Sequence, residues 1–213
     1  MSGYEVAHVD ELERLPVTAG DQRFTWRPVR RRFGVSAFGT NAYTAEHAGE
    51  DLIEEHRERD GHEEMYTVLR GRATFTLGDD TVDAPAGTLV FVRPGTLRKA
   101  VAAEDDTAVL AVGAKPGVVF EPSPWEDVFV AYSYAESGDV ERARSVFRET
   151  IAKDQGAWQG YFNAACVEAR FGDHDEAISL LARAIELGGD EARNAAKTDS
   201  DLDAIRGRAD FLE

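Results

Sequence analysis

The sequence predicts a mixed fold of two domains, an antiparallel β sandwich or barrel followed by an all-α domain of helical hairpins. Short apolar runs recur roughly every ten residues in the first part, separated by Gly and Pro, which is typical of antiparallel β proteins. Helical periodicity replaces these runs beyond about residue 120, and a 34-residue internal repeat follows. A length of 213 residues fits two small domains.

Five runs in the first part are predicted strands, because β-branched and aromatic residues fill them and turn residues end them. They cover residues 65–69, 73–77, 81–83, 88–92 and 108–112, and residues 34–39 and 43–45 are expected to add strands at the front. The basic run Arg30-Arg31-Arg32 is interpreted as a solvated edge strand or loop, the alternative being an anion site. The carboxylate-rich residues 46–64 are interpreted mainly as a solvated acidic loop.

The domain boundary is predicted at residue 122. Residues 116–124 hold three prolines, which a helix interior does not accept. The predicted domains are therefore 1–122 and 123–213. The first has 14 basic and 21 acidic residues and the second 10 and 19, so neither is a basic recognition module.

The composition excludes several classes of function. A net charge of −16 argues against nucleic acid and anionic membranes as partners. No apolar run is long enough to span a bilayer, and the first residues do not resemble a secretory signal. The single cysteine, Cys166, is expected to be a core thiol and rules out an intrachain disulfide. We therefore expect a cytoplasmic protein, and no nucleotide-binding or nucleophile-elbow motif is present.

The stretch from His62 to Gly71 resembles the first motif of the cupin superfamily, because Glu64 and Gly71 keep its six-residue spacing. Residues 86–98 resemble the second motif with one-residue differences. The resemblance covers about residues 30–115 and implies an antiparallel double-stranded β barrel.

The resemblance also indicates where a metal site would lie. Metal-binding cupins use two histidines and a glutamate of the first motif and a histidine of the second. In this sequence His56 takes the first place, Glu58 replaces the second histidine, Glu64 is retained, and Arg98 replaces the last histidine. A guanidinium stays protonated and repels a cation, so the usual three-histidine site is absent.

Three interpretations of His56, Glu58, His62, Glu64 and Arg98 remain open. In the first, His56, Glu58 and Glu64 hold Mn²⁺, Fe²⁺ or Zn²⁺, and Arg98 binds an anionic substrate. In the second, Arg98 pairs with a glutamate in a metal-free pocket that binds a small acid or a sugar-like ligand. In the third, these residues are solvated on a scaffold. We expect small-molecule binding with no assigned catalytic residue; the alternative is a divergent metal-dependent cupin enzyme of the oxygenase or isomerase type.

Residues 125–187 resemble two tetratricopeptide repeats. Gly138-Asp139 recurs as Gly172-Asp173, and Glu168 is a departure at a place that favours an aromatic residue. The resemblance implies a shallow groove for a protein or peptide partner, with Asn163 and Arg170 as candidate contacts. The alternative is that the helices pack on their own barrel or mediate self-association.

Both ends of the chain carry further expectations. A third helix is expected over residues 191–197, followed by a short helix from Asp201 that Ser200 caps. Residues 1–30, which include Trp26, are expected to form an outer strand that pairs with a second barrel, since an exposed edge needs covering. The resemblance to cupins thus implies a homodimer.

Overall fold

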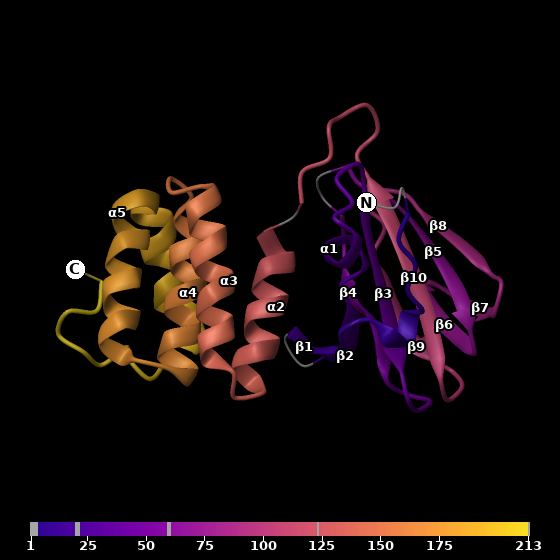
Figure 1. Cartoon of the computed structure of the whole chain (residues 1–213), viewed down its shortest axis with the longest axis horizontal. Coiled ribbons are helices and arrows are strands. Elements are labelled where there is room, and N and C mark those ends of the chain that lie inside the picture. Colours follow the sequence, from indigo (N-terminus) through magenta and orange to yellow (C-terminus); the bar gives the residue numbers. More distant parts are fainter. Residues whose placement is uncertain (1–3, 20–21, 59–60, 123, 213) are drawn as a thin grey trace. The chain divides into compact units, whose positions relative to one another are not determined.

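The computed structural model describes residues 4–19, 22–58, 61–122 and 124–212. The chain divides into two compact units, Met1–Pro122 and Ser123–Glu213. Strands dominate the first unit and helices the second (Figure 1). None of the helices in these ranges is both long enough and apolar enough to cross a membrane.

In its described residues, the first unit contains ten strands, a short helix α1 and a 3₁₀ turn at Val9–Glu11. The strands are β1 (Leu15–Ala19), β2 (Gln22–Arg27), β3 (Gly39–Ala45), β4 (Asp51–His56), β5 (Glu63–Arg70), β6 (Arg72–Leu77), β7 (Asp80–Pro85), β8 (Leu89–Val92), β9 (Arg98–Ala102) and β10 (Thr107–Ala114), and α1 is Val29–Phe33.

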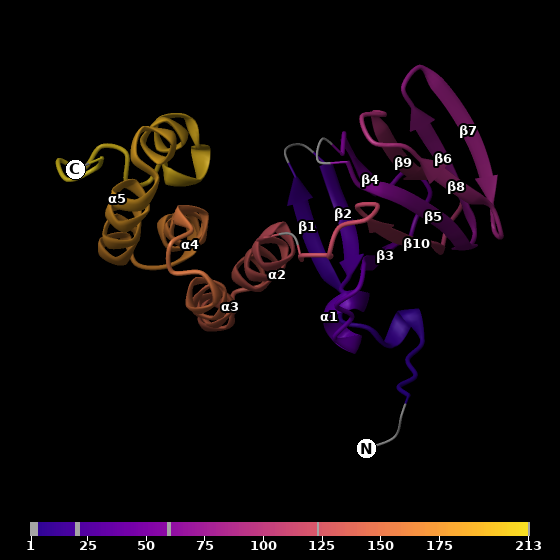
Figure 2. The same cartoon turned by 90° about the horizontal axis from the view of Figure 1, so that it is seen from above.

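These strands form one strongly curled sheet in the order β7-β6-β9-β4-β2-β3-β10-β5-β8, with β1 added beside β2 (Figure 2). Most neighbours are antiparallel, but β2 and β4 run parallel where Phe24 meets Asp51. The expectation of a purely antiparallel barrel is therefore replaced by a mixed sheet. The parallel pair arises because β3 separates β2 from β4 in the chain but not in the sheet.

Side-chain alternation builds the core of the barrel. On β5, Tyr66 and Val68 are buried while Met65 and Leu69 are exposed, and on β6 Ala73 and Phe75 point inward. Burial of such side chains, at about 25 cal/mol per Å² of apolar surface, is the main stabilisation of the curled sheet.

Three predictions for the first unit need correction. Arg30, Arg31 and Arg32 lie in α1, which ends at Gly34 in the left-handed conformation, not in an edge strand. Residues 34–38 precede β3 and are not a strand. The acidic segment contains β4, in which the adjacent Leu52 and Ile53 are both buried, so no alternation of polar and apolar residues marks it as a strand.

The N-terminal strands complete the sheet of their own chain. β1 pairs with β2, and β2 pairs with β3 and β4. Trp26 is only 1% exposed because it packs inside this sheet. A homodimer stays a prediction. Because residues 15–27 are already paired within their own chain, a second barrel would have to contact another surface.

The second unit consists of α2 (Pro124–Glu136), α3 (Val140–Lys153), α4 (Trp158–Phe171), α5 (His174–Thr198) and a 3₁₀ turn at Ser200–Leu202. The four helices stand side by side in chain order, as Figure 2 shows nearly end-on. Starts of α2 and α4 are 34 residues apart (158 − 124), as are those of α3 and α5 (174 − 140). Small residues at the contacts, such as Ala165 and Ala177, are fully buried and allow the helices to approach closely.

The end of the second unit differs from the expectation in two details. The third helix expected over residues 191–197 is the second half of α5, which continues beyond a kink at Gly189, whose φ is 55°. The closing turn is capped by Asp199 and not by Ser200, because the Asp199 side chain accepts a hydrogen bond from the Asp201 N–H at 3.0 Å. A carboxylate is a good N-cap acceptor.

Candidate functional site

A group of polar side chains gathers inside the barrel where β4 ends, β5 begins and β9 begins. His56 stands opposite Arg98 in the β4–β9 register. Glu64 and Tyr66 come from β5 and point to the same face as the buried Val68, because side chains two residues apart share a face. We call Glu54, His56, Glu58, Glu64, Tyr66 and Arg98 the barrel cluster.

The imidazole of His56 lies between three glutamates. Its Nε2 is 3.8 Å from Glu58 Oε1 and 3.8 Å from Glu64 Oε2. Its Nδ1 is 2.9 Å from the carbonyl oxygen of Glu54, which favours a proton on Nδ1 and leaves Nε2 facing the carboxylates. Burial by itself would lower the pKa of His56, but the carboxylates of Glu64 and Glu54 raise it above its usual value.

Arg98 is the most unusual member of the barrel cluster, because its side chain is fully buried. Its Nε lies 3.6 Å from Glu64 Oε2, and its Nη2 donates to the carbonyl of Arg93 at 3.4 Å. Neither Nε nor Nη1 has a hydrogen-bond partner among the described residues. A buried charged donor without an acceptor is costly, so these two nitrogens are suited to an acceptor group from outside the chain.

Glu64 is held in its ionised form by its neighbours. Tyr66, which is fully buried, donates its hydroxyl to Glu64 Oε2 at 2.6 Å. Burial opposes ionisation, but His56, Tyr66 and Arg98 outweigh it and lower the pKa of Glu64. The same arrangement raises the pKa of Tyr66 well above its usual value, first through burial and then through the charge of Glu64. Tyr66 therefore remains a hydrogen-bond donor at neutral pH.

Glu54 belongs to the barrel cluster although the sequence placed it in a solvated loop. Its Oε1 lies 3.9 Å from His56 Nδ1, and its Oε2 is buried without a partner among the described residues. Burial raises the pKa of Glu54 above its usual value. No period-two pattern marks Glu54, because the register of β4 with β9 is irregular on both sides of Ile53. Alternation along β5 from Glu64 would have found Tyr66.

The structure brings four of the five predicted pocket residues together. His56, Glu58, Glu64 and Arg98 lie in the barrel cluster. His62 lies in the turn before β5, and no hydrogen bond or ion pair joins it to them in the described part of the chain. Because His62 precedes the first residue of β5, the strand alternation that directs Glu64 inward does not fix the direction of its side chain.

His56, Glu58 and Glu64 could together hold a metal ion. One ligand atom from each lies within 4.8 Å of the others. One imidazole nitrogen and two carboxylate oxygens form a donor set that suits Mn²⁺, Fe²⁺ or Zn²⁺. The residues therefore fit a divalent cation, although Arg98 next to Glu64 adds positive charge to the site.

Cys166 also lies near two carboxylates, those of Asp199 and Asp201. Its side chain is 1% exposed, and burial raises the pKa of the thiol far above its usual value. The thiol is therefore protonated at neutral pH and packs as a small apolar group.

The two candidate partner-binding residues lie on α4. Asn163 donates its amide to the carbonyl of Gln159 on the same helix, at 2.9 Å. Arg170 forms ion pairs with Asp201 at 3.2 Å and with Glu136 at 3.7 Å. The guanidinium of Arg170 is thus occupied within the helical unit, and its role in partner binding stays a prediction.

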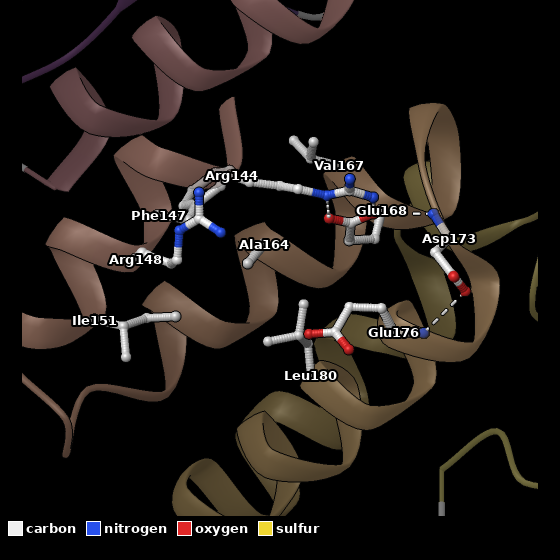
Figure 3. Close-up of a pocket in the computed structure, with 10 residues that line it drawn as sticks. All are labelled: Arg144, Phe147, Arg148, Ile151, Ala164, Val167, Glu168, Asp173, Glu176 and Leu180. Atoms are coloured by element: carbon white, nitrogen blue, oxygen red, sulfur yellow. Dashed lines mark hydrogen bonds and ion pairs between the residues drawn. The ribbon is translucent and has the colours of Figure 1, made fainter. Parts of the chain in front are cut away.

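A cavity of about 350 Å³ opens between α3, α4 and α5 (Figure 3). Phe147, Val167 and Leu180 supply apolar lining, and Arg144 crosses one end to pair with Glu168. Neither Asn163 nor Arg170 lines it. The departure at Glu168 from the repeat pattern is explained by this ion pair, in which Arg144 Nε and Nη2 donate to the two carboxylate oxygens at 2.5 and 2.7 Å.

Residues 44–113 match the family model of the cupin domain. No curated protein matches the chain. Similar solved structures include a cupin protein from Bacteroides fragilis, with 17% identity over 58% of this chain and 93% of that one, at a TM-score of 0.42.

Two further similar structures have printed activities. A predicted oxalate decarboxylase from Thermotoga maritima has 17% identity over 52% of this chain and 99% of that one, at a TM-score of 0.44. A sugar phosphate isomerase of the cupin superfamily from Silicibacter pomeroyi has 16% identity over 52% of this chain and 76% of that one, also at a TM-score of 0.44. At these scores the structures carry no functional argument, and the assignment depends on the family match. The N-terminal part of this chain, over residues 44–113, is a cupin domain.

Proposed function

We propose that the cupin barrel binds a small polar molecule at the barrel cluster. The observation that carries this proposal is the fully buried Arg98, whose Nε and Nη1 have no hydrogen-bond partner among the described residues. His56 and Glu58 are 26% and 27% exposed, so the cluster is open to solvent on their side. A ligand that enters there would supply the missing acceptors and contact the carboxylates.

The replacement Arg98→Met tests this proposal. Methionine fills a similar volume without charge, and Glu64, which loses its ion pair with Arg98, keeps the hydrogen bond from Tyr66 and the neighbouring imidazole of His56. We expect the variant to fold and to lose the thermal stabilisation that polar metabolites give the intact chain. Arg57→Met is the matched control, because Arg57 is an exposed arginine of β4's flanking segment that bonds to the Gly95 carbonyl. If no compound stabilises the wild-type chain, the proposal is wrong.

A second candidate function is a divalent metal centre, favoured by the approach of His56, Glu58 and Glu64 within 4.8 Å. These three side chains would hold the ion, which would supply Lewis-acid or redox chemistry for an enzyme of the oxygenase or isomerase type. We expect purified chain reconstituted with Mn²⁺, Fe²⁺ or Zn²⁺ to retain about one equivalent, and His56→Ala to lose at least about tenfold in metal affinity. Metal analysis after removal of free ions measures this; less than a tenth of an equivalent in the wild-type chain would contradict it.

We also propose that the helical unit, as a tetratricopeptide-like pair of hairpins, binds a protein or its own barrel.

We propose in addition that the barrel forms a homodimer. Support for the dimer comes from β8, which ends the sheet order and exposes Leu89 (63%) and Phe91 (50%) beside Met65. An edge strand with exposed apolar side chains favours pairing with another strand. Light scattering of the purified chain measures its mass, and a monomer at all concentrations would contradict the dimer.

A further inference from the structure

The barrel cluster leaves three buried polar atoms without a hydrogen-bond partner among the described residues. Two are donors, Nε and Nη1 of Arg98, and one is an acceptor, Oε2 of Glu54. Buried polar groups are nearly always hydrogen-bonded in folded proteins. A molecule that satisfies all three must offer both acceptor oxygens and a donor hydrogen.

The charges of the barrel cluster restrict the acceptor group. Arg98 is the permanent cation and pairs with Glu64, while Glu54, Glu58 and Glu64 surround the imidazole of His56. A doubly charged phosphate would meet these carboxylates with twice the repulsion that a singly charged group meets. A carboxylate is planar and singly charged and matches the guanidinium in geometry.

The same carboxylates define the remainder of the ligand. Ionised glutamates accept hydrogen bonds and do not donate them. A ligand with only a carboxylate would contact Arg98 and leave the glutamates facing an anion without compensation. Hydroxyl groups on neighbouring carbons would donate to Glu54 and Glu58, which offsets that repulsion.

We propose that the ligand of the barrel cluster is a small hydroxycarboxylate, whose carboxylate binds Arg98 and whose hydroxyl groups donate to Glu54 and Glu58. This inference rests on the small-molecule site proposed above and assigns its ligand class. The carboxylate and the hydroxyl groups of the ligand contact different residues, so each contact can be tested separately.

The test is calorimetric binding to the full-length chain with glycerate, propionate, glycerol and inorganic phosphate as probes. The first three share a three-carbon skeleton and differ in having both groups, only the carboxylate, or only hydroxyls. We expect glycerate to bind at least about tenfold more tightly than propionate or glycerol, because each of those leaves buried polar groups unpaired. Phosphate should bind more weakly than glycerate.

Two variants assign the contacts. Arg98→Met should weaken glycerate at least about tenfold and remove its advantage over glycerol, while Arg57→Met should change neither. Glu54→Leu should remove most of the advantage of glycerate over propionate. If Arg98→Met fails to fold, Arg98→Lys, which keeps the charge but loses the planar fork, should still weaken glycerate several-fold.

Three outcomes would overturn the inference: equal affinities for glycerate and propionate, equal affinities for glycerate and glycerol, or no glycerate binding at millimolar concentration. In each of these cases, the small-molecule site would still be supported if another polar compound stabilised the wild-type chain and Arg98→Met abolished that stabilisation. If no such compound were found and glycerate did not bind, both the small-molecule site and its assigned ligand class would be wrong. Tighter binding of phosphate than glycerate would assign the site to phosphorylated ligands and contradict the carboxylate.

Discussion

Replacing Gly71 with alanine should destabilise the barrel by about 3 kcal/mol, the largest effect that we expect from a single methyl group. Gly71 joins β5 to β6 with φ of 67°, a left-handed conformation that disfavours other residues. A Cβ there would also lie 2.4 Å from Thr107 Oγ1 and 2.8 Å from Thr107 Cα. Thr107 is fully buried and its hydroxyl donates to the Glu104 carbonyl at 2.7 Å, so it cannot move away.

Gly78→Ala is the matched control for this prediction. Gly78 has a similar φ of 63°, but a Cβ there would meet nothing within 4 Å. It should therefore show only the conformational penalty, about 1 kcal/mol. Hydrogen exchange of the barrel amides during urea unfolding separates this unit from the helices. Equal losses in the two variants would show that the contact with Thr107 does not matter.

Replacing Glu168 with glutamine should destabilise the helical unit by about 2 kcal/mol at neutral pH, less than for a fully buried pair because Arg144 is partly exposed. Burial opposes ionisation of Glu168, but the hydrogen bonds from Arg144 and from the Asp173 N–H lower its pKa below 4.5. The stabilisation is therefore complete above about pH 4.5 and is lost as the pH falls through the lowered pKa. The difference between wild type and variant should narrow below pH 4.5.

Urea unfolding followed by helical circular dichroism at several pH values measures that difference. Glu186→Gln is the control, because Glu186 pairs with Arg183 on the exposed face of α5. The loss of stability in Glu186→Gln should be much smaller than in Glu168→Gln, because water screens an exposed ion pair. A difference between wild type and Glu168→Gln that stays constant from pH 7 to acid would contradict the role of the Glu168 charge.

The barrel cluster could be predicted from the sequence only where a spacing marked it. Glu64 and Gly71 keep a fixed separation, and Arg98 ends a recognisable turn-containing stretch. Glu54 and Tyr66 have no such spacing, and the carboxylates around Glu54 made β4 look like a solvated loop. Alternation along β5 from Glu64 would have found Tyr66, whereas the irregular register of β4 around Ile53 hides Glu54 from that rule.

The sequence by itself determined the change from strands to helices near residue 120 and the 34-residue spacing of the helix pairs, because both are local periodicities of apolar residues. Only the tertiary structure decided that His56 of β4 stands opposite Arg98 of β9, 42 residues later (98 − 56). It also decided that Arg98 is fully buried, with two nitrogens that have no hydrogen-bond partner among the described residues. Strand order and burial depend on contacts between distant segments, which no local pattern records.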